Sequence, residues 1–190
     1  MSLPVCPDNC QDQLAEFKFD DCAPEWARGE VSIVYMFSPA YPVVANPRTD
    51  REGFIAEMAA RVSNTSNAAN AIRKLVVIGE KPEPDKSTIK MSANRTIVTN
   101  KNHTLMFNID ELSQENRDAQ RQSECQNKFA LMWEVDWLIF GGSENIGDGA
   151  VCTVQMDTIV PVDRTALSYI KCTATWEDKF SPDSCTNPLI

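Results

Sequence analysis

The sequence FALMWEVDWLI, residues 129–139, carries the clearest strand pattern in the chain. Every second residue is apolar, and a period of two is typical of a strand that buries one face. The pattern predicts one continuous strand over 129–139, about 36 Å long at about 3.3 Å per residue, longer than most strands. The residues expected on its core face are Phe129, Leu131, Trp133, Val135, Trp137 and Ile139.

Two carboxylates, Glu134 and Asp136, fall on the opposite face of this predicted strand. Paired acids at this spacing can serve a glycosidase, but no feature of the sequence sets one of them apart as the acid. Two acids on the solvated side of a strand are the simpler interpretation. We therefore expect both side chains to face solvent.

Size and charge narrow the class of protein. The 190 residues suit one domain with a sizeable core, and the net charge of −9 argues against general affinity for nucleic-acid phosphates or anionic lipids. The chain starts without a basic, then apolar leader pattern and has no apolar run of about 20 residues, which predicts cytosolic assembly and no membrane contact. Residues 1–28 are rich in acids and predict an irregular acidic arm.

The remaining pattern predicts a β-rich α+β fold. Strands are expected at 31–37, a short buried one around 75–78, three more over 88–109, then 150–160 and 168–176. A capping box of Thr49 and Glu52 predicts a helix near 50–62, and the polar stretch 110–127 favours a second, exposed helix. The prolines near 79–88 predict a projecting loop, and the glycines of 141–149 a hairpin loop.

We therefore predict an antiparallel β-sandwich or barrel with one or two flanking helices and extended N- and C-terminal arms. The predicted domain spans 29–180, between the arm at 1–28 and a C-terminal tail at 181–190.

Residues that could carry catalysis or bind a metal are few. His103 is the only histidine, and it stands at the predicted entrance of a strand, where we expect a surface or hydrogen-bonding role. Cys6, Cys10, Cys22 and Cys185 could in principle hold zinc, but the Cys-x3-Cys spacing has no second close pair, and burial as small packing residues explains the cysteines better. The sequence predicts no cofactor, no metal site and no enzymatic activity.

From about residue 72 to 180, the order of features resembles the tail-tube proteins of tailed bacteriophages. The resemblance is carried by KLVVIGEKPEPDKSTIKMSANRTIV, HTLMFNIDELSQENRDAQR, LMWEVDWLIFGG and IKCTATWEDKF. It implies a virion structural protein assembled in the host bacterial cytoplasm. Subunits, six to a ring, would stack as a tube beside neighbouring virion proteins, and DNA would pass through for ejection without specific binding.

This resemblance gives the predicted long strand a use. A strand edge left open on a monomer invites aggregation, whereas a neighbouring subunit in a closed ring would cover it. A bore lined by carboxylates would repel the phosphate backbone, so we expect Glu134 and Asp136 to line the channel.

Three other interpretations stay open. The N-terminal arm and the proline-bearing loops also suit a neck or connector ring at the head–tail junction. A monomeric β-sandwich module that binds carbohydrate is supported by the glycine-rich loop 141–149, although the tryptophans fall in core phase. A thiol or zinc enzyme would depend on Cys6, Cys10, Cys22 and His103.

Overall fold

The computed structural model describes residues 29–63, 68–92, 95–125, 127–162 and 165–190. The predicted acidic arm, with Cys6, Cys10 and Cys22, lies outside the described residues. The elements in chain order are β1 (Val31–Phe37), α1 (Arg51–Val62), β2 (Arg73–Glu80), β3 (Asp85–Ser92), β4 (Arg95–Ile109), α2 (Gln114–Cys125), β5 (Lys128–Val135), β6 (Leu138–Phe140), the 3-10 turn η1 (Ile146–Asp148), β7 (Ala150–Ile159), β8 (Tyr169–Asp178) and β9 (Ser184–Thr186).

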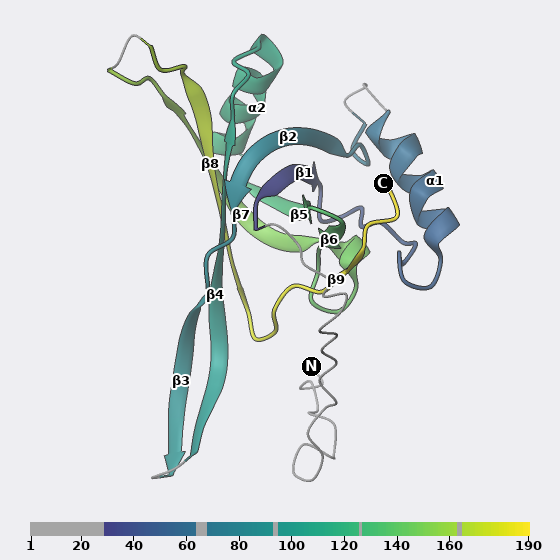
Figure 1. The fold of residues 1–190 in the computed structure, drawn as a ribbon, viewed down its shortest axis with the longest axis vertical. Coiled ribbons are helices and arrows are strands. Elements are labelled where there is room, and N and C mark those ends of the chain that lie inside the picture. The colour runs from purple at the N-terminus through teal and green to yellow at the C-terminus, as the bar shows by residue number, and fades with distance from the viewer. Residues whose placement is uncertain (1–28, 64–67, 93–94, 126, 163–164) are drawn as a thin grey trace, which may run out of the picture.

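Six antiparallel strands of the described chain close into a barrel in the order β1, β2, β4, β8, β7, β5, and β5 pairs again with β1 (Figure 1). The closure depends on a close approach at Gly79, where β2 meets β4. A Cβ at this position would lie 2.7 Å from both the carbonyl oxygen of Met106 and the Cβ of Phe107. The predicted β-rich fold with flanking helices is confirmed, and the sheet is a closed barrel.

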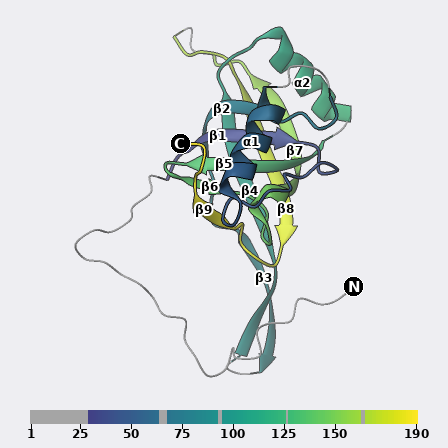
Figure 2. The same ribbon diagram turned by 90° about the vertical axis from the view of Figure 1, so that its right-hand side faces the viewer.

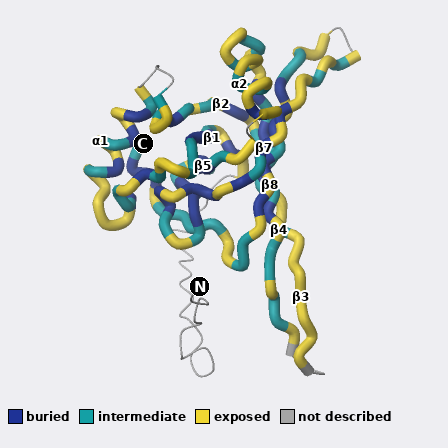
Figure 3. The backbone as a smooth tube through the Cα atoms, turned by 180° about the vertical axis from the view of Figure 1, so that it is seen from behind, coloured by how far each residue is buried: buried dark blue, intermediate teal, exposed yellow. Residues whose placement is uncertain are grey.

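The barrel interior is the larger of two cores. Strands β7 and β8 alternate buried and exposed residues along their length, so one face of each fills the barrel and the other faces outward (Figure 3). Trp133 is the largest fully buried side chain of the described residues, and its ring lies 5.8 Å from the rings of both Phe140 and Trp176. This interior core is what the apolar alternation of the sequence encodes.

The second core lies outside the barrel wall, under α1 (Figure 2). Phe54 and Met58 of α1 are buried in it together with Ala130 and Met132 of β5. The N-cap lies one residue later than expected, because the Asp50 carboxylate, not Thr49, accepts the hydrogen bond from the Gly53 amide at 3.0 Å. The predicted helix near 50–62 is confirmed with a different N-cap.

At its other end, Arg61 fixes α1 to the chain that precedes it. Its buried guanidinium donates to the carbonyl oxygens of Tyr41, Pro42 and Asn70, and it pairs with Glu57 at 2.9 Å.

The predicted second helix is confirmed as α2, which lies against β7 near one end of the barrel. No helix in the described part of the chain is both long and apolar enough to cross a membrane.

Residues 79–88, predicted to be a loop, are mostly strand. Only 81–84 interrupt the edge, and β2 and β3 pair one after the other with the same strand, β4. The proline-bearing segment is tolerated because it lies between two edge pairings and not inside one. The strand predicted around 75–78 is confirmed as part of β2, but it is not buried throughout, since Val77 is 6 % exposed whereas Val76 and Ile78 are 76 % and 56 % exposed.

The long strand of this protein is β4, with 15 residues. Two of the predicted short strands, RTIVTN and HTLMFNI, join in it. Its C-terminal part, Lys101–Ile109, pairs with β8 in the barrel, whereas the preceding part pairs with β3 alone. The result is a two-stranded ribbon that projects well beyond the barrel (Figures 1 and 2).

The strand predicted over 129–139 turns back on itself. β5 ends at Val135, Asp136 and Trp137 form a two-residue loop, and β6 returns along β5 with Leu138 opposite Val135. The expected C-terminal tail is docked on this hairpin: β9 pairs with β6, and the Asn187 amide donates to the Trp137 carbonyl at 2.8 Å.

Candidate functional site

Glu134 does not face solvent, in contrast to the sequence-based expectation. It is only 5 % exposed, on the outer wall of the barrel within the layer that contains Tyr35 and Met132. The Tyr35 hydroxyl donates a 2.6 Å hydrogen bond to Glu134 Oε1, and burial, followed by this bond and the carboxylate charge, raises the Tyr35 pKa. A carboxylate held in this way is a structural partner of Tyr35 and is not available to line a channel in the folded chain.

Asp136 is exposed, but it belongs to a turn and not to a strand face. Its φ of 53° places it in the left-handed region at the first position of the two-residue loop, where glycine is usual. The structure therefore separates the two acids that the sequence pattern had placed side by side. Asp136 remains on the surface, and Glu134 does not.

His103 lies inside β4, and it is fully buried. Its ring stacks on Trp176 with 5.2 Å between ring centres, Nε2 lies 3.1 Å from the Phe180 carbonyl oxygen, and Nδ1 has no hydrogen-bond partner. Burial, and then the charge of Lys81, lower the His103 pKa. The expected hydrogen-bonding role is confirmed, and the expected surface position is wrong.

Four cysteines lie within the described residues, of which Cys125 is exposed, Cys185 is partly buried, and two are fully buried. Cys152 and Cys172 are buried in the barrel, and burial raises the pKa of each thiol to about 12. Among the residues that the structure describes, no three histidine, cysteine or acidic side chains gather as a metal site would require. The zinc hypothesis cannot be followed further, since three of its four cysteines lie outside the described ranges.

Two adjoining hollows lie on the barrel wall formed by β4, β8 and β7. One, of about 490 Å³, is lined by both polar and apolar residues, among them Thr104, Thr153, Thr175, Lys128 and Glu177. The other, of about 260 Å³, lies beside the glycine-rich loop and contains the Ser143 hydroxyl, which donates to Asp178 at 2.6 Å. Trp176 lines both but is only 8 % exposed, so it presents no open ring face for a sugar.

The ribbon is defined here as residues 81–101, of which the structure describes 81–92 and 95–101, and most of β3 within it is exposed (Figure 3). Among the residues that the structure describes, β3 pairs with β4 alone, so no described strand covers the backbone donors and acceptors of its other edge. Ile89 and Met91 on β3 are 54 % and 64 % exposed. A two-stranded ribbon of this kind is only marginally stable in water by itself. The exposure of its apolar side chains to water does not stabilise it, and such exposed apolar groups are typical of interaction sites.

A second exposed apolar group lies at the opposite end of the molecule, where β7 and β8 extend past the barrel beside α2 (Figure 1). Val160, Val162 and Leu167 are 73 %, 101 % and 81 % exposed. We call this region, residues 110–125 together with 160–162 and 165–167, the α2 end. Sequence reasoning missed both apolar groups, because alternation in short strands indicates which residues share a face but not whether that face is covered.

No protein-family model, no curated protein and no solved structure matches this chain.

Proposed function

We propose that this protein is a non-enzymatic structural protein of a virion, and that it self-assembles into rings, expected to be hexameric, that form a tail tube or conduit for DNA. The observation that carries the proposal is the ribbon. It extends an open strand edge and exposed apolar side chains away from a barrel that is already closed. Such a segment serves a contact with another chain better than it serves the stability of its own.

The strand edge available to a neighbouring subunit is not the one that the sequence predicted. The sequence suggested that residues 129–139 offer an edge for a neighbour to complete, but β5 is paired on both sides within the barrel. Among the described strands, β3 has an edge with no partner strand. Lys86 and Lys90 on this strand disfavour uncontrolled edge-to-edge pairing, as lysines on edge strands commonly do.

The wall most suited to a bore is the outward face of β4, β8 and β7. Thr175 lies opposite Thr104 on one side and Thr153 on the other, and Lys171 lies between Asn108 and Asp157 in the same manner. Hydroxyl and amide groups with balanced charge offer few contacts to a phosphate backbone, whose protein affinity comes mainly from lysine and arginine. DNA would pass such a wall without specific binding.

Two measurements test assembly. Native mass and negative-stain imaging over a range of concentrations should show rings, stacked rings or filaments for the wild-type chain. A short-ribbon variant, in which residues 88–99 are replaced by Asn-Gly to join Ser87 to Asn100 through a two-residue turn, should keep the barrel but lose assembly. Circular dichroism and thermal unfolding check that the barrel has folded.

Contrary results are easily recognised. A wild-type chain that stays a monodisperse monomer at every concentration would overturn the proposal and favour the monomeric carbohydrate-binding module. Assembly that persists in the short-ribbon variant would remove the ribbon as its cause. A ring that does not stack would favour the neck or connector position over the tube.

A further inference from the structure

Exposed apolar side chains occur at several places, including Val76 and Ile78 of β2, but those of the ribbon and of the α2 end lie at opposite ends of the longest axis, and all views of the backbone agree on this (Figures 1, 2 and 3). The ribbon with Ile89 and Met91 forms one end, and the α2 end with Val160, Val162 and Leu167 forms the other. Contacts between unlike ends of identical chains are heterologous, and they propagate into rings or filaments instead of closing as a pair.

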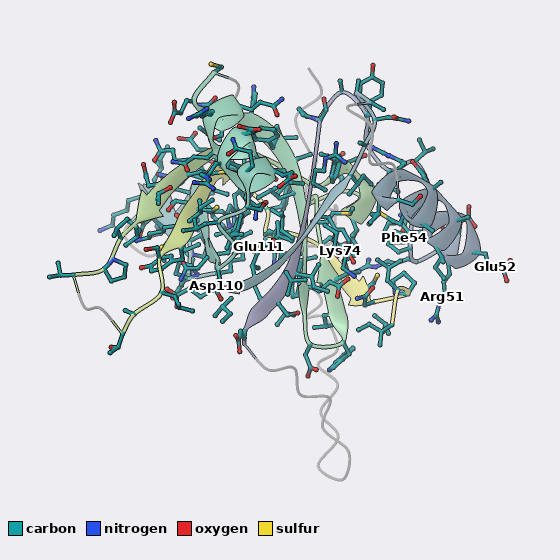
Figure 4. All side chains as sticks on the ribbon, turned by 90° about the horizontal axis from the view of Figure 1, so that it is seen from above. Arg51, Glu52, Phe54, Lys74, Asp110 and Glu111 are labelled. Carbon is teal, nitrogen blue, oxygen red and sulfur yellow. The ribbon has the colours of Figure 1, made fainter. Side chains whose placement is uncertain are left out.

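The charges of the two ends are opposite. The ribbon, residues 81–101, has five basic and two acidic residues and a net charge of +3, within a chain whose total is −9. Residues 110–125 of the α2 end have five acidic and two basic residues and a net charge of −3. Asp110 and Glu111 lie exposed at the start of this segment, beside α2 (Figure 4). Complementary charge of this kind steers association and selects the orientation of the contact.

We propose that the ribbon of one copy docks on the α2 end of the next copy, in a polar head-to-tail contact. This inference depends on the proposed self-assembly and names the surfaces that carry it. The apolar side chains at the two ends bury one another, while Lys90, together with Lys86, which also pairs with Glu83 at 2.6 Å within the ribbon, faces acidic residues of the α2 end. The occupant of each surface is therefore a second copy of this chain.

A mixing experiment separates this arrangement from other modes of assembly. The short-ribbon variant keeps an intact α2 end, and the triple variant Val160→Ser, Val162→Ser, Leu167→Ser keeps an intact ribbon. Alone, each variant should be monomeric. Mixed in equal amounts, they retain one complementary pair of surfaces and should form a one-to-one heterodimer, measured by native mass spectrometry or sedimentation.

The charges are tested by exchange. Lys86→Glu with Lys90→Glu, or Asp110→Lys with Glu111→Lys, should each weaken association about tenfold at low salt, and the chain that combines all four substitutions should recover to within about threefold of wild type. The control is Lys74→Glu with Arg51→Glu. These residues lie on β2 and at the start of α1, outside the ribbon and the α2 end, and Figure 4 shows them apart from Asp110 and Glu111; their reversal should leave association unchanged.

Failure of this inference differs from failure of the proposed function. Head-to-tail docking is wrong, and self-assembly stands, if wild type assembles but the mixed variants stay monomeric. The same conclusion follows if the chain with all four charge substitutions does not recover association. If the heterodimer forms but disappears when residues 1–28 are deleted from both chains, the acidic arm occupies the ribbon and the proposed contact is overturned.

Discussion

Residues 95–109 and residues 128–140 are of similar length, and both are β-structure, but they differ in what covers them. The first forms one unbroken strand, β4, of which only the C-terminal part lies in the barrel. The second folds into the β5–β6 hairpin at the centre of the molecule, where Leu131 and Trp133 fill the barrel and Ala130 and Met132 lie under α1. A strand covered on both faces is confined by the size of its core, whereas a strand that leaves the core can be as long as its partner allows.

The comparison also explains the fate of the polar residues in each segment. In β5, Glu134 is buried and must therefore be hydrogen-bonded, which Tyr35 provides. In the projecting part of β4, Thr96 and Thr99 are exposed and need no buried partner. The same alternation in sequence thus has different physical consequences inside and outside the packed region.

The largest effect is expected for Trp133→Ala, since the ring is 1 % exposed and packs on Phe140 and Trp176. The free energy of unfolding should fall by about 3–5 kcal/mol. Trp137→Ala is the control, because the pattern gave both residues the same role but Trp137 lies in the turn and is only partly buried. Chemical denaturation measures both, and equal losses would contradict this assignment.

Tyr35→Phe tests the buried hydrogen bond of β5. Removal of the hydroxyl leaves the Glu134 carboxylate without its donor, and should lower the free energy of unfolding by about 1.5–3 kcal/mol. Glu134→Gln keeps an acceptor of the same shape and should cost less in the same denaturation experiment. If Tyr35→Phe leaves the free energy of unfolding unchanged, the hydrogen bond to Glu134 does not stabilise the fold, and Glu134 faces solvent.

Asp136→Val tests the turn that ends β5. A β-branched residue is poorly accommodated at a φ of 53°, and we expect a loss of about 1–2 kcal/mol. Asp136→Gly, which suits this backbone conformation, should stay within about 1 kcal/mol of wild type. If both variants unfold at the same denaturant concentration, the positive φ contributes nothing to the cost.

The pH dependence of stability tests the burial of His103 in the barrel part of β4. Burial and Lys81 lower its pKa in the folded chain, so below about pH 6.5 the unfolded chain takes up a proton that the folded chain resists. Stability should therefore fall as the pH falls through this range. His103→Gln, which can still donate to the Phe180 carbonyl, should lose less in melting temperature between pH 7.5 and 5.5, and parallel losses would exclude the histidine as the cause.

The smallest effect is expected in the ribbon. Ile89→Thr replaces a side chain that is 54 % exposed with another good strand former, and should change the free energy of unfolding by no more than about 0.5 kcal/mol. Thermal unfolding of the isolated chain at low concentration measures it. A larger loss would show that the ribbon, like β5, stabilises the barrel of its own chain.

The fold class followed from patterns that depend on neighbours in sequence. Apolar alternation placed Leu131 and Trp133 in the core, and the capping-box spacing of Thr49 and Glu52 identified α1 to within one residue of its N-cap. The candidate site followed much less well. The pattern predicted Glu134 to be exposed, whereas it is buried. The reason is that the helix that covers β5 comes from a segment some 75 residues earlier in the chain.

The sequence by itself determined which residues alternate, where a helix begins, and that one end of the chain is acidic, because these depend on side chains a few positions apart. Tertiary structure alone decided that β5 is covered on both faces, that β4 runs past the barrel, and that the basic ribbon and the acidic α2 end lie far apart. Those outcomes depend on pairings between strands distant in sequence, whose register is set by packing and not by local preference.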